Sequence, residues 1–386
     1  MLTRHGIVLL VGGVAALVVA RVFAVLELFV IGAACFAAAA IAVVYVRVRL
    51  PRVEAARWVH PSVLVAGDTG RVDLHLHHRG RLRSAAFVLC EHVQRSTDHT
   101  PREARLRVDP MSRDLRTSTG YPLPSAARGV ILLGPLDVEL RDPLGIARST
   151  RTVAGVDEVV VAPRAYLLEM PRLGQGMLGN ALLDKARRLG PGEFHGLREY
   201  ADGDEPRNIH WRASARTDSL MVKEHTVEGL HRCTVTFDAD PASYSTTDAF
   251  ELGITAAASV VHSAARAGLS TRFVTAGGVD LRGPDVGANT LRVLARIAPS
   301  TSAPAVLDRD TGDGLGLVVV VTGNAATSAW RSTQSMMDPT LTPLLITTDD
   351  HGRSRQGLSI SARSEPQFIA AWQLLTGRGR LDLVER

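Results

Sequence analysis

Lysine is almost absent from this chain of 386 residues. Lys185 and Lys223 are the only two, so 44 − 2 = 42 of the basic residues are arginine. A coding bias toward arginine explains this composition, and the alternative explanation is an anionic partner such as nucleic acid. The arginines are scattered along the sequence, and 39 acidic residues nearly balance them. We therefore expect no nucleic-acid partner.

Two further absences exclude other classes of protein. The three cysteines, Cys35, Cys90 and Cys233, lie far apart and form no CxxC pair, so neither a disulfide framework nor a zinc site is predicted. The glycine-rich signatures GxGxxG and GxxxxGKS/T are missing as well, which leaves no support for a nucleotide-binding site. We expect no resident cofactor.

Charge is scarce near the N-terminus, where residues 7–46 are almost wholly apolar and only Arg21 and Glu27 are charged. One helix of that length measures about 60 Å, whereas the hydrocarbon core of a bilayer is about 30 Å thick. Two spans, 6–22 and 27–46, each approach the ~20 residues that a crossing requires. A cleaved signal peptide fits less well, because the apolar stretch is too long and no A-x-A boundary follows it. Residues 1–50 are predicted to form a transmembrane hairpin.

Arginine flanks this hairpin unevenly. Arg4 precedes the first span, the turn carries only Arg21, and four arginines follow the second span: Arg47, Arg49, Arg52 and Arg57. Positive charges in short flanking segments favour the cytoplasmic side of a membrane. We therefore predict a multi-pass protein of the cell inner (plasma) membrane, with both ends of the hairpin and everything after residue 50 in the cytoplasm.

Residues 51–165 consist of short alternating segments separated by clusters of Gly, Pro, Asp and Ser. Strands are predicted at 71–78, 85–94, 104–109 and 156–163. No helical periodicity is sustained, so the pattern indicates an antiparallel β-sandwich of immunoglobulin size.

Two features of this segment allow a functional and a structural interpretation. His75 and His77 share one face of a strand and are candidate metal ligands. No third ligand has an obvious spacing, so a solvent-facing polar stripe is favoured. Asp142 opens the sequence Asp-Pro-Leu-Gly, which is typical of a tight turn, and we expect its side chain to bond the turn backbone.

Strand–helix alternation begins near residue 231. Strands are predicted at 231–238, 271–276, 315–323 and 342–348, and helices at 247–268, 290–298, 325–337 and 366–377. Repeated β–α units predict a doubly wound parallel sheet over residues 231–386. Ligands of such sheets bind beyond the carboxyl ends of the strands, where Asp238 and Asp240 follow the first strand.

Charged and aromatic residues are most densely interleaved between Gly192 and Glu224, within a connecting segment, 166–230, that also contains a predicted linker helix. One hypothesis is an internal clamp covered by Tyr200 and Trp211, because arginine forks bind carboxylates in a fixed geometry. Its pairs would join two sets of residues: Arg198, Arg207, Arg212 and Arg216 with Glu199, Asp202, Asp204 and Glu224.

The other hypothesis for this stretch is a docking surface or a site. His195, Glu199, His210 and His225 are candidates for metal ligation or proton transfer. A nucleophilic interpretation would pair Ser214 with His210, four residues apart on a helix.

The same stretch closely resembles the signature of the bacterial domain of unknown function 58 (DUF58) family. The segment GPLDVELRDPLGIA and the N-terminal hairpin also look like that family, so the resemblance spans nearly the whole chain. The signature is met at fifteen positions: Gly192, Phe194, Gly196, Leu197, Arg198, Tyr200, Gly203, Asp204, Arg207, Ile209, Trp211, Ala213, Ser214, Ala215 and Arg216.

The resemblance implies that the C-terminal part is similar to von Willebrand factor A domains. Those domains often hold Mg²⁺ through D-x-S-x-S after the first strand, with a Thr and an Asp from later loops. Asp238 meets the first position, Asp240 replaces a Ser, and Ala242 has no ligand oxygen. Thr322 or Asp349 would complete such a site. A Mg²⁺ site at Asp238 and Asp240 is therefore a minor hypothesis, beside a fold relic that binds no ion.

The resemblance also implies a partner, because family members are associated with MoxR-type AAA+ ATPases and with transglutaminase-like membrane proteins. We expect a non-enzymatic adaptor or scaffold in an assembly or chaperone-like module at the membrane. The alternative is a metal-dependent hydrolase or transferase that uses the strand-end carboxylates and the motif histidines. No catalytic residue is assigned, and the expected binding or structural motif comprises Gly192, Phe194, Gly196, Arg198, Glu199, Tyr200, Gly203, Asp204, Arg207, His210, Trp211, Ser214, Arg216, Lys223 and Glu224.

Overall fold

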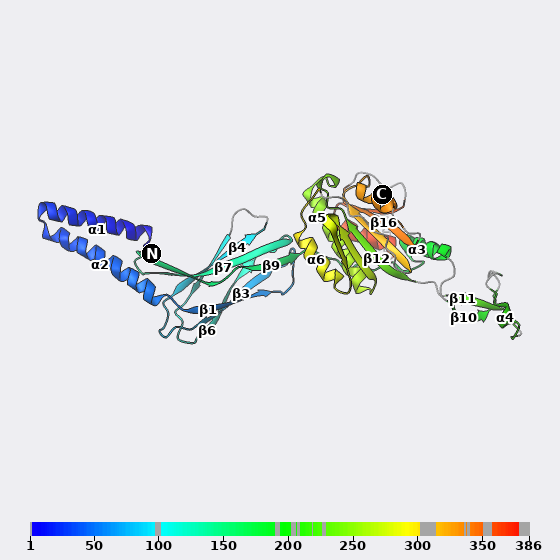
Figure 1. The fold of residues 1–386 in the computed structure, drawn as a ribbon, viewed down its shortest axis with the longest axis horizontal. Helices are drawn as coiled ribbons and strands as arrows, with labels where there is room; N and C mark the ends of the chain where they lie inside the picture. Colours follow the sequence, from blue (N-terminus) through cyan, green and yellow to red (C-terminus); the bar gives the residue numbers. More distant parts are fainter. Residues whose placement is uncertain are drawn as a thin grey trace, which may run out of the picture. The chain divides into compact units, whose positions relative to one another are not determined.

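The structure is a computed structural model that describes residues 2–96, 102–189, 194–201, 206, 209–217, 219–225, 229–301, 314–335, 337, 340–349 and 357–377. The chain divides into two compact units, Met1–Ala162 and Pro163–Arg386 (Figure 1). The first unit contains two helices and two sheets, and the second contains a largely parallel sheet with helices.

Two apolar helices form the start of the first unit. Helix α1 (Arg4–Phe23) and helix α2 (Leu26–Arg49) are both long and apolar enough to cross a membrane. The turn between them lies at Ala24 and Val25, inside the region that the sequence predicts. Ala24 takes the left-handed conformation that glycine usually supplies, with φ 54°.

Small residues line the seam between these helices. A Cβ atom on Gly32 would lie 2.6 Å from Leu17 Cγ, so glycine is what permits the two backbones to approach closely. Buried positions recur at intervals of seven residues, at Gly6, Gly13 and Ala20 on α1 and at Gly32, Ala39 and Val46 on α2, where Ala42 is buried as well.

Two sheets complete the first unit. The smaller has the order β1-β3-β6, with β1 (Val53–His60), β3 (Gly70–His78) and β6 (Arg116–Leu123) antiparallel. The larger has the order β2-β9-β7-β4-β5: β2 (Leu64–Val65), β9 (Asp157–Ala162), β7 (Gly129–Arg141), β4 (Phe87–Arg95) and β5 (Arg102–Val108), with β8 (Arg148–Ala154) also paired to β7. The four strands predicted from alternation are all present.

One hydrophobic core joins the two sheets, because alternate residues such as Leu74, Leu89 and Leu133 point inward and are fully buried. His75 lies exposed on the opposite side of β3, as a polar stripe requires. His78 departs from that stripe. It is 2% exposed, and its Nε2 lies 2.9 Å from the Leu82 carbonyl oxygen.

An ion pair inside the first unit also joins the two sheets. Arg57 on β1 donates from Nε to Glu91 Oε1 on β4 at 2.6 Å. Their side chains are only 4% and 1% exposed. Burial, and secondarily the charge of Glu91, raises the pKa of the neighbouring Tyr121 phenol. A buried pair of this kind fixes geometry. Arg57 also pairs with the more exposed Asp157, so loss of Glu91 leaves the buried side of the guanidinium without its charged acceptor.

Glu91→Ala should therefore destabilise the first unit by about 3–5 kcal/mol, whereas Arg57→Met/Glu91→Leu should recover most of that loss. Hydrogen exchange of the β4 amides, measured by mass spectrometry on the detergent-solubilised chain, checks both variants. Equal exchange in Glu91→Ala and wild type would contradict the predicted role of the pair.

The second unit is built on a six-stranded sheet with the order β14-β13-β12-β15-β16-β17. Its strands are β12 (Leu230–Phe237), β13 (Ser270–Thr275), β14 (Val279–Arg282), β15 (Leu315–Thr322), β16 (Leu341–Thr347) and β17 (Leu358–Ser361). All neighbouring pairs are parallel except β13 and β14.

The strands predicted from the sequence pair in parallel, and the structure adds an antiparallel edge strand, β14, that the sequence does not predict. Only Ala276–Gly278 separates β13 from β14, with Gly277 at φ 79°. A parallel pair needs a crossover of a dozen or more residues, so this short turn forces an antiparallel hairpin.

Helices bury the two faces of this sheet. Helices α5 (Thr247–Arg266), α6 (Val286–Arg296), α8 (Glu365–Thr376) and α3 (Gly176–Leu189) contribute to one core, with Val235 and Val319 of the sheet. Helix α7 (Ser328–Ser335) places Trp330 over Val318 and Val320 on the other face. Strand β15 is buried at every residue, which explains its continuous apolar sequence.

An acidic side chain ties the antiparallel edge together. Asp280 on β14 accepts hydrogen bonds from Arg272 Nε at 2.9 Å and Nη2 at 2.8 Å, and from Arg282 Nη2 at 3.0 Å. These bonds, foremost that from Arg272, lower the pKa of the Asp280 carboxyl from 3.8 to about 2.

A carboxyl group whose pKa is lower in the folded state contributes stability above its unfolded pKa and loses it on acidification. Asp280→Asn should therefore remove the part of the pH dependence of unfolding that falls between about pH 4 and pH 2. Urea unfolding followed by the buried Trp330 and Trp372, with the exposed Trp58 and Trp211 replaced by Phe, measures this effect. Asp285→Asn, at an exposed aspartate, is the control and should keep the wild-type slope; an identical slope in Asp280→Asn would refute the prediction.

Candidate functional site

The carboxyl end of β12 is the first candidate site, because this end of a parallel sheet collects loops from several strands. Asp238 follows β12 directly and is 8% exposed. Its Oδ2 accepts hydrogen bonds from Ser243 Oγ at 2.7 Å and from Thr322 Oγ1 at 2.8 Å. Its Oδ1 accepts from the backbone N–H of Asp240 at 3.1 Å. Both oxygens of the Asp238 carboxylate are thus engaged by the protein itself.

Thr322 brings a second strand into this site. It ends β15, which lies next to β12 although the chain visits β13 and β14 in between. The order of strands reverses between β12 and β15, and a doubly wound sheet binds ligands at such a point. Gly323 follows Thr322, and a Cβ atom there would collide with the Ser243 carbonyl oxygen. Glycine is therefore required for the two loops to meet.

Asp240 and Asp349 do not join Asp238 at a common point. Asp240 Oδ1 accepts from the N–H of Ala242 at 2.9 Å and caps the short turn Pro241–Ser243. Asp349 follows β16 and accepts from the N–H and the hydroxyl of Ser245, at 2.6 and 2.7 Å. Both carboxylates are thus engaged by the loop that follows β12.

These residues fit Mg²⁺ poorly. The ion requires near-octahedral oxygen ligation and keeps several waters. Ser243 and Thr322 give their hydroxyl protons to Asp238 and are only 6% and 0% exposed, which leaves little room for a hydrated ion. Among the residues that the structure describes, no group of three or more His, Cys, Asp or Glu side chains is placed to hold a metal.

Tyr244 packs beside this site against the apolar core of the second unit. Tyr244 donates its hydroxyl to the Asp238 carbonyl oxygen at 2.6 Å and packs against Phe237 and Phe250. Burial, followed by the charges of Asp238 and Asp349, raises the pKa of the Tyr244 phenol well above its usual range. The phenol therefore remains a hydrogen-bond donor and does not act as a general base.

The charged stretch is the second candidate site, and it forms a small hairpin. Strands β10 (Phe194–Glu199) and β11 (Met221–His225) pair antiparallel, and a one-turn helix, α4 (Trp211–Ser214), lies between them in the sequence. Backbone bonds from Tyr200 N to Leu220 O and from His210 N to Met221 O, both 2.7 Å, fasten it.

Ser214 and His210 have structural roles in this hairpin. His210 Nδ1 accepts from the N–H of Ala213 at 3.0 Å and so caps α4. The Ser214 hydroxyl lies 3.2 Å from the His210 carbonyl oxygen and accepts from the N–H of Met221 at 2.8 Å. The hydroxyl is thus bonded to the backbone, not to the imidazole that a nucleophilic pair would need.

The outer surface of the hairpin carries exposed cations and an aromatic ring. Trp211 is 66% exposed, and Arg212 and Arg216 are exposed beside it. Arg198 donates to the carbonyl oxygen of Glu199 at 3.0 Å, and the Glu199 carboxylate accepts from Ser219 Oγ at 3.1 Å.

Much of the predicted clamp cannot be compared with the structure, because its residues are not described or are described by their backbone alone. Gly192, Asp202, Gly203, Asp204 and Arg207 lie outside the residues that the structure describes. Five other motif residues are described by their backbone alone: Phe194, His195, Lys223, Glu224 and His225, while Gly196 has no side chain. Whether the motif arginines pair with these carboxylates stays a prediction.

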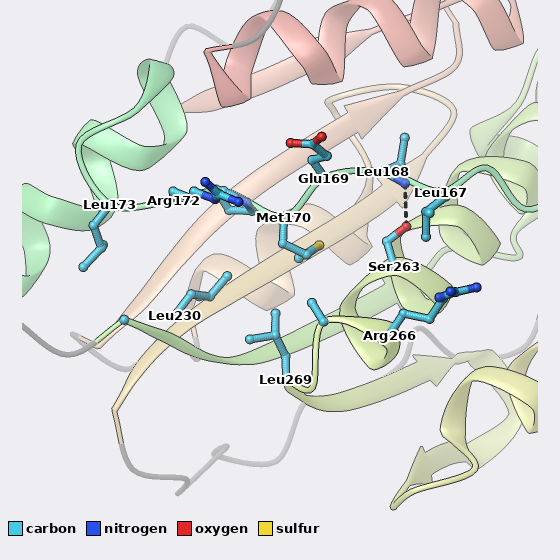
Figure 2. A pocket seen from close by; sticks show the side chains of 13 residues that line it. Leu167, Leu168, Glu169, Met170, Arg172, Leu173, Leu230, Ser263, Arg266 and Leu269 are labelled. Carbon is cyan, nitrogen blue, oxygen red and sulfur yellow. Dashed lines mark hydrogen bonds between the residues drawn. The ribbon is translucent and has the colours of Figure 1, made fainter.

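A groove of about 660 Å³ lies at the opposite, amino ends of β12 and β13 (Figure 2). Leu230 and Leu269 line it from the two strands, and Arg266 from the end of α5. The extended segment 167–173 forms its wall, fixed where Leu168 N donates to Ser263 Oγ at 2.8 Å.

Sequence reasoning found Asp238 and missed most of its partners. Ser243, Tyr244 and Ser245 come from the same loop, and their spacing after Asp238 was the only available signal. No sequence pattern predicts the groove, because the residues that line it come from separate segments of the chain.

Comparison with known families gives one match. Residues 196–322 match the model of the family described as "Protein of unknown function DUF58". The match runs from within β10 to the end of β15, so it includes most of the charged hairpin together with Asp238, Ser243 and Thr322, and it supports the DUF58 resemblance. No curated protein matches the chain.

Solved structures offer only weak likenesses. The CARDB domain of a Pyrococcus furiosus protein, solved with di-metal ions, is 9% identical, with 29% of this chain and 93% of that one covered and a TM-score of 0.22. The putative ApaA protein of Bordetella pertussis is 10% identical, with 29% and 93% covered and a TM-score of 0.22. A β-glucosidase of Listeria innocua is 15% identical, with 31% and 17% covered and a TM-score of 0.22. TM-scores this low carry no argument about fold or function.

Asp238→Ala should destabilise the second unit by on the order of 3 kcal/mol, because it leaves buried hydroxyls without an acceptor. Asp240→Ala removes only a turn cap and should cost about 1 kcal/mol. Urea unfolding followed by Trp330 and Trp372 measures both. Millimolar Mg²⁺ should leave the wild-type midpoint unchanged. A Mg²⁺-dependent rise that disappears in Asp238→Asn would instead establish a metal site.

Proposed function

We propose that this chain is a membrane-anchored adaptor that recruits a MoxR-type AAA+ ATPase, together with other membrane proteins of the same assembly or chaperone-like module. The helices α1 and α2 would span the plasma membrane as a hairpin. An immunoglobulin-sized β-sandwich and a von Willebrand A-like domain would follow in the cytoplasm.

The exposed surface of α4 carries this proposal. Trp211 is 66% exposed, Arg212 lies exposed on the same short helix, and Arg216 lies exposed just after its end. Tryptophan and arginine supply much of the binding energy at protein interfaces. Because the hairpin has its own hydrogen bonds, this surface is ready before a partner arrives.

The geometry at the two candidate sites favours an adaptor over a hydrolase or transferase. Catalysis would need Asp238, Asp240 and a motif His or Glu to converge on one reacting atom. Asp238 instead accepts three internal hydrogen bonds, Asp240 caps a turn, and the Ser214 hydroxyl is bonded to the backbone.

A von Willebrand A-like second unit agrees with the largely parallel sheet and with helices on both of its faces. In this proposal Asp238 has kept the place of a metal ligand and serves as the hydrogen-bond acceptor that holds the loops together.

The test is capture of the ATPase by the full-length chain in nanodiscs, using a purified MoxR-type ATPase from the same genome. Arg212→Glu/Arg216→Glu should weaken binding about tenfold or more, and Trp211→Ala should do so to a similar extent. Arg292→Glu/Arg296→Glu reverses a matched pair of exposed arginines, also four residues apart, on α6 and should bind like wild type. Equal losses in both double variants, or no binding by wild type, would refute the adaptor.

A further inference from the structure

We propose that the end of the first unit next to its helices is a second membrane contact, which binds the anionic headgroup region of the bilayer. Two exposed leucines, Leu82 and Leu144, and the arginines beside them would form this contact. The inference rests on the proposed membrane anchor and goes beyond it, because it gives the sheets a bilayer-binding surface of their own.

Leu82 lies in a loop tied to the end of the second helix. The loop 79–86 leaves β3, and its Arg79 N donates to the Arg52 carbonyl oxygen at 2.8 Å. Arg49, the last residue of α2, donates from Nη1 to the Arg83 carbonyl oxygen at 3.3 Å. Where α2 leaves the bilayer, this loop must therefore lie at the membrane surface.

Leu144 lies in a loop tied to the start of the first helix. Asp142 Oδ2 accepts from the N–H of Leu144 at 2.9 Å, which forms the tight turn that the sequence predicts. Thr3 precedes α1, and its N–H donates to the Ile146 carbonyl oxygen at 2.9 Å. Gly6 lies against that carbonyl with no space for a Cβ atom. This loop therefore lies at the level where α1 enters the bilayer.

The two leucines point outward although the unit has a core to bury them. Leu82 is 64% exposed and Leu144 is 73% exposed. Apolar side chains at this level gain by entering the interface between headgroups and acyl chains.

The loop around Leu82 is positively charged, although its Arg79 pairs with Glu54 and Asp142 lies beside Leu144. The loop 79–86 has the sequence RGRLRSAA, with Arg79, Arg81 and Arg83 and no acidic residue. Arg81 and Arg83 are exposed. Arginines this close to a bilayer attract anionic lipids, by about fivefold for each residue. An alternation of arginine and leucine fits an anionic membrane surface better than an apolar protein partner.

The far end of the same unit supplies a matched control. Strand β1 runs away from the helices over eight residues, about 27 Å, and Val63 follows it. Val63 is 64% exposed, like Leu82. It should stay in water when the two leucines touch the bilayer.

The experiment places one environment-sensitive fluorophore at a time on the full-length chain in nanodiscs. Cysteines replace Leu82, Leu144, Val63 or, within α1, Val14, in a Cys35→Ala background. Burial raises the pKa of the Cys90 and Cys233 thiols to about 11 and about 12, so these thiols stay protonated and unlabelled. Nanodiscs of phosphatidylcholine with and without phosphatidylglycerol carry spin labels in the headgroups or the acyl chains.

With phosphatidylglycerol present, headgroup spin labels should quench the fluorophores at 82 and 144 but not at 63, and Arg81→Glu/Arg83→Glu should abolish the quenching. Arg292→Glu/Arg296→Glu, in the second unit, should not change it. Quenching at 82 and 144 no stronger than at 63, or equal quenching with and without anionic lipid, would overturn the inference. The fluorophore at 14 separates the two proposals, because acyl-chain labels that fail to quench it would overturn the anchor as well.

Discussion

A single carboxylate, Asp238, holds together the part of the second unit where the order of strands reverses. Its Oδ2 receives the hydroxyl of Thr322, which is 84 residues away in the sequence, and the hydroxyl of Ser243 from its own loop. The ends of β12 and β15, two strands that are far apart in the sequence, are thereby joined. Gly323 lies close to the Ser243 backbone at the same place, and Tyr244 donates its hydroxyl to the backbone carbonyl oxygen of Asp238.

Burial explains which elements could be predicted. Strand β15 and helix α5 lie almost wholly inside the second unit, so their apolar patterns are long and unmistakable. Strands β14 and β17 have four residues each, too few to show a period, and they were not predicted. The charged hairpin is recognisable as a motif in the sequence. Its strands are not predicted, because the sequences FHGLRE and MVKEH show no alternation of apolar and polar residues.

The candidate site at Asp238 likewise has one part that the sequence predicts and another that it does not. Asp238 was predicted because its position after an apolar strand is a local feature of the sequence. Its hydrogen bonds to Ser243 and Thr322 depend on where two loops meet in space, which no local pattern records. The same limit applies to Asp349, whose carboxylate accepts hydrogen bonds from Ser245, and to Ser214, whose hydroxyl bonds the backbone beside His210.

The close approach of α1 and α2 at their small residues has a mechanical consequence. A Cβ atom on Gly32 would collide with Leu17, so the two helices interlock where their backbones approach. Sliding α1 by one turn would bring Leu10 to the place of Gly6, against the Ile146 carbonyl, where no side chain fits. The helices therefore cannot slip past each other or past the loop that ends β7. In the proposed membrane anchor, a tilt of the two helices would therefore be transmitted to the loop that follows β7.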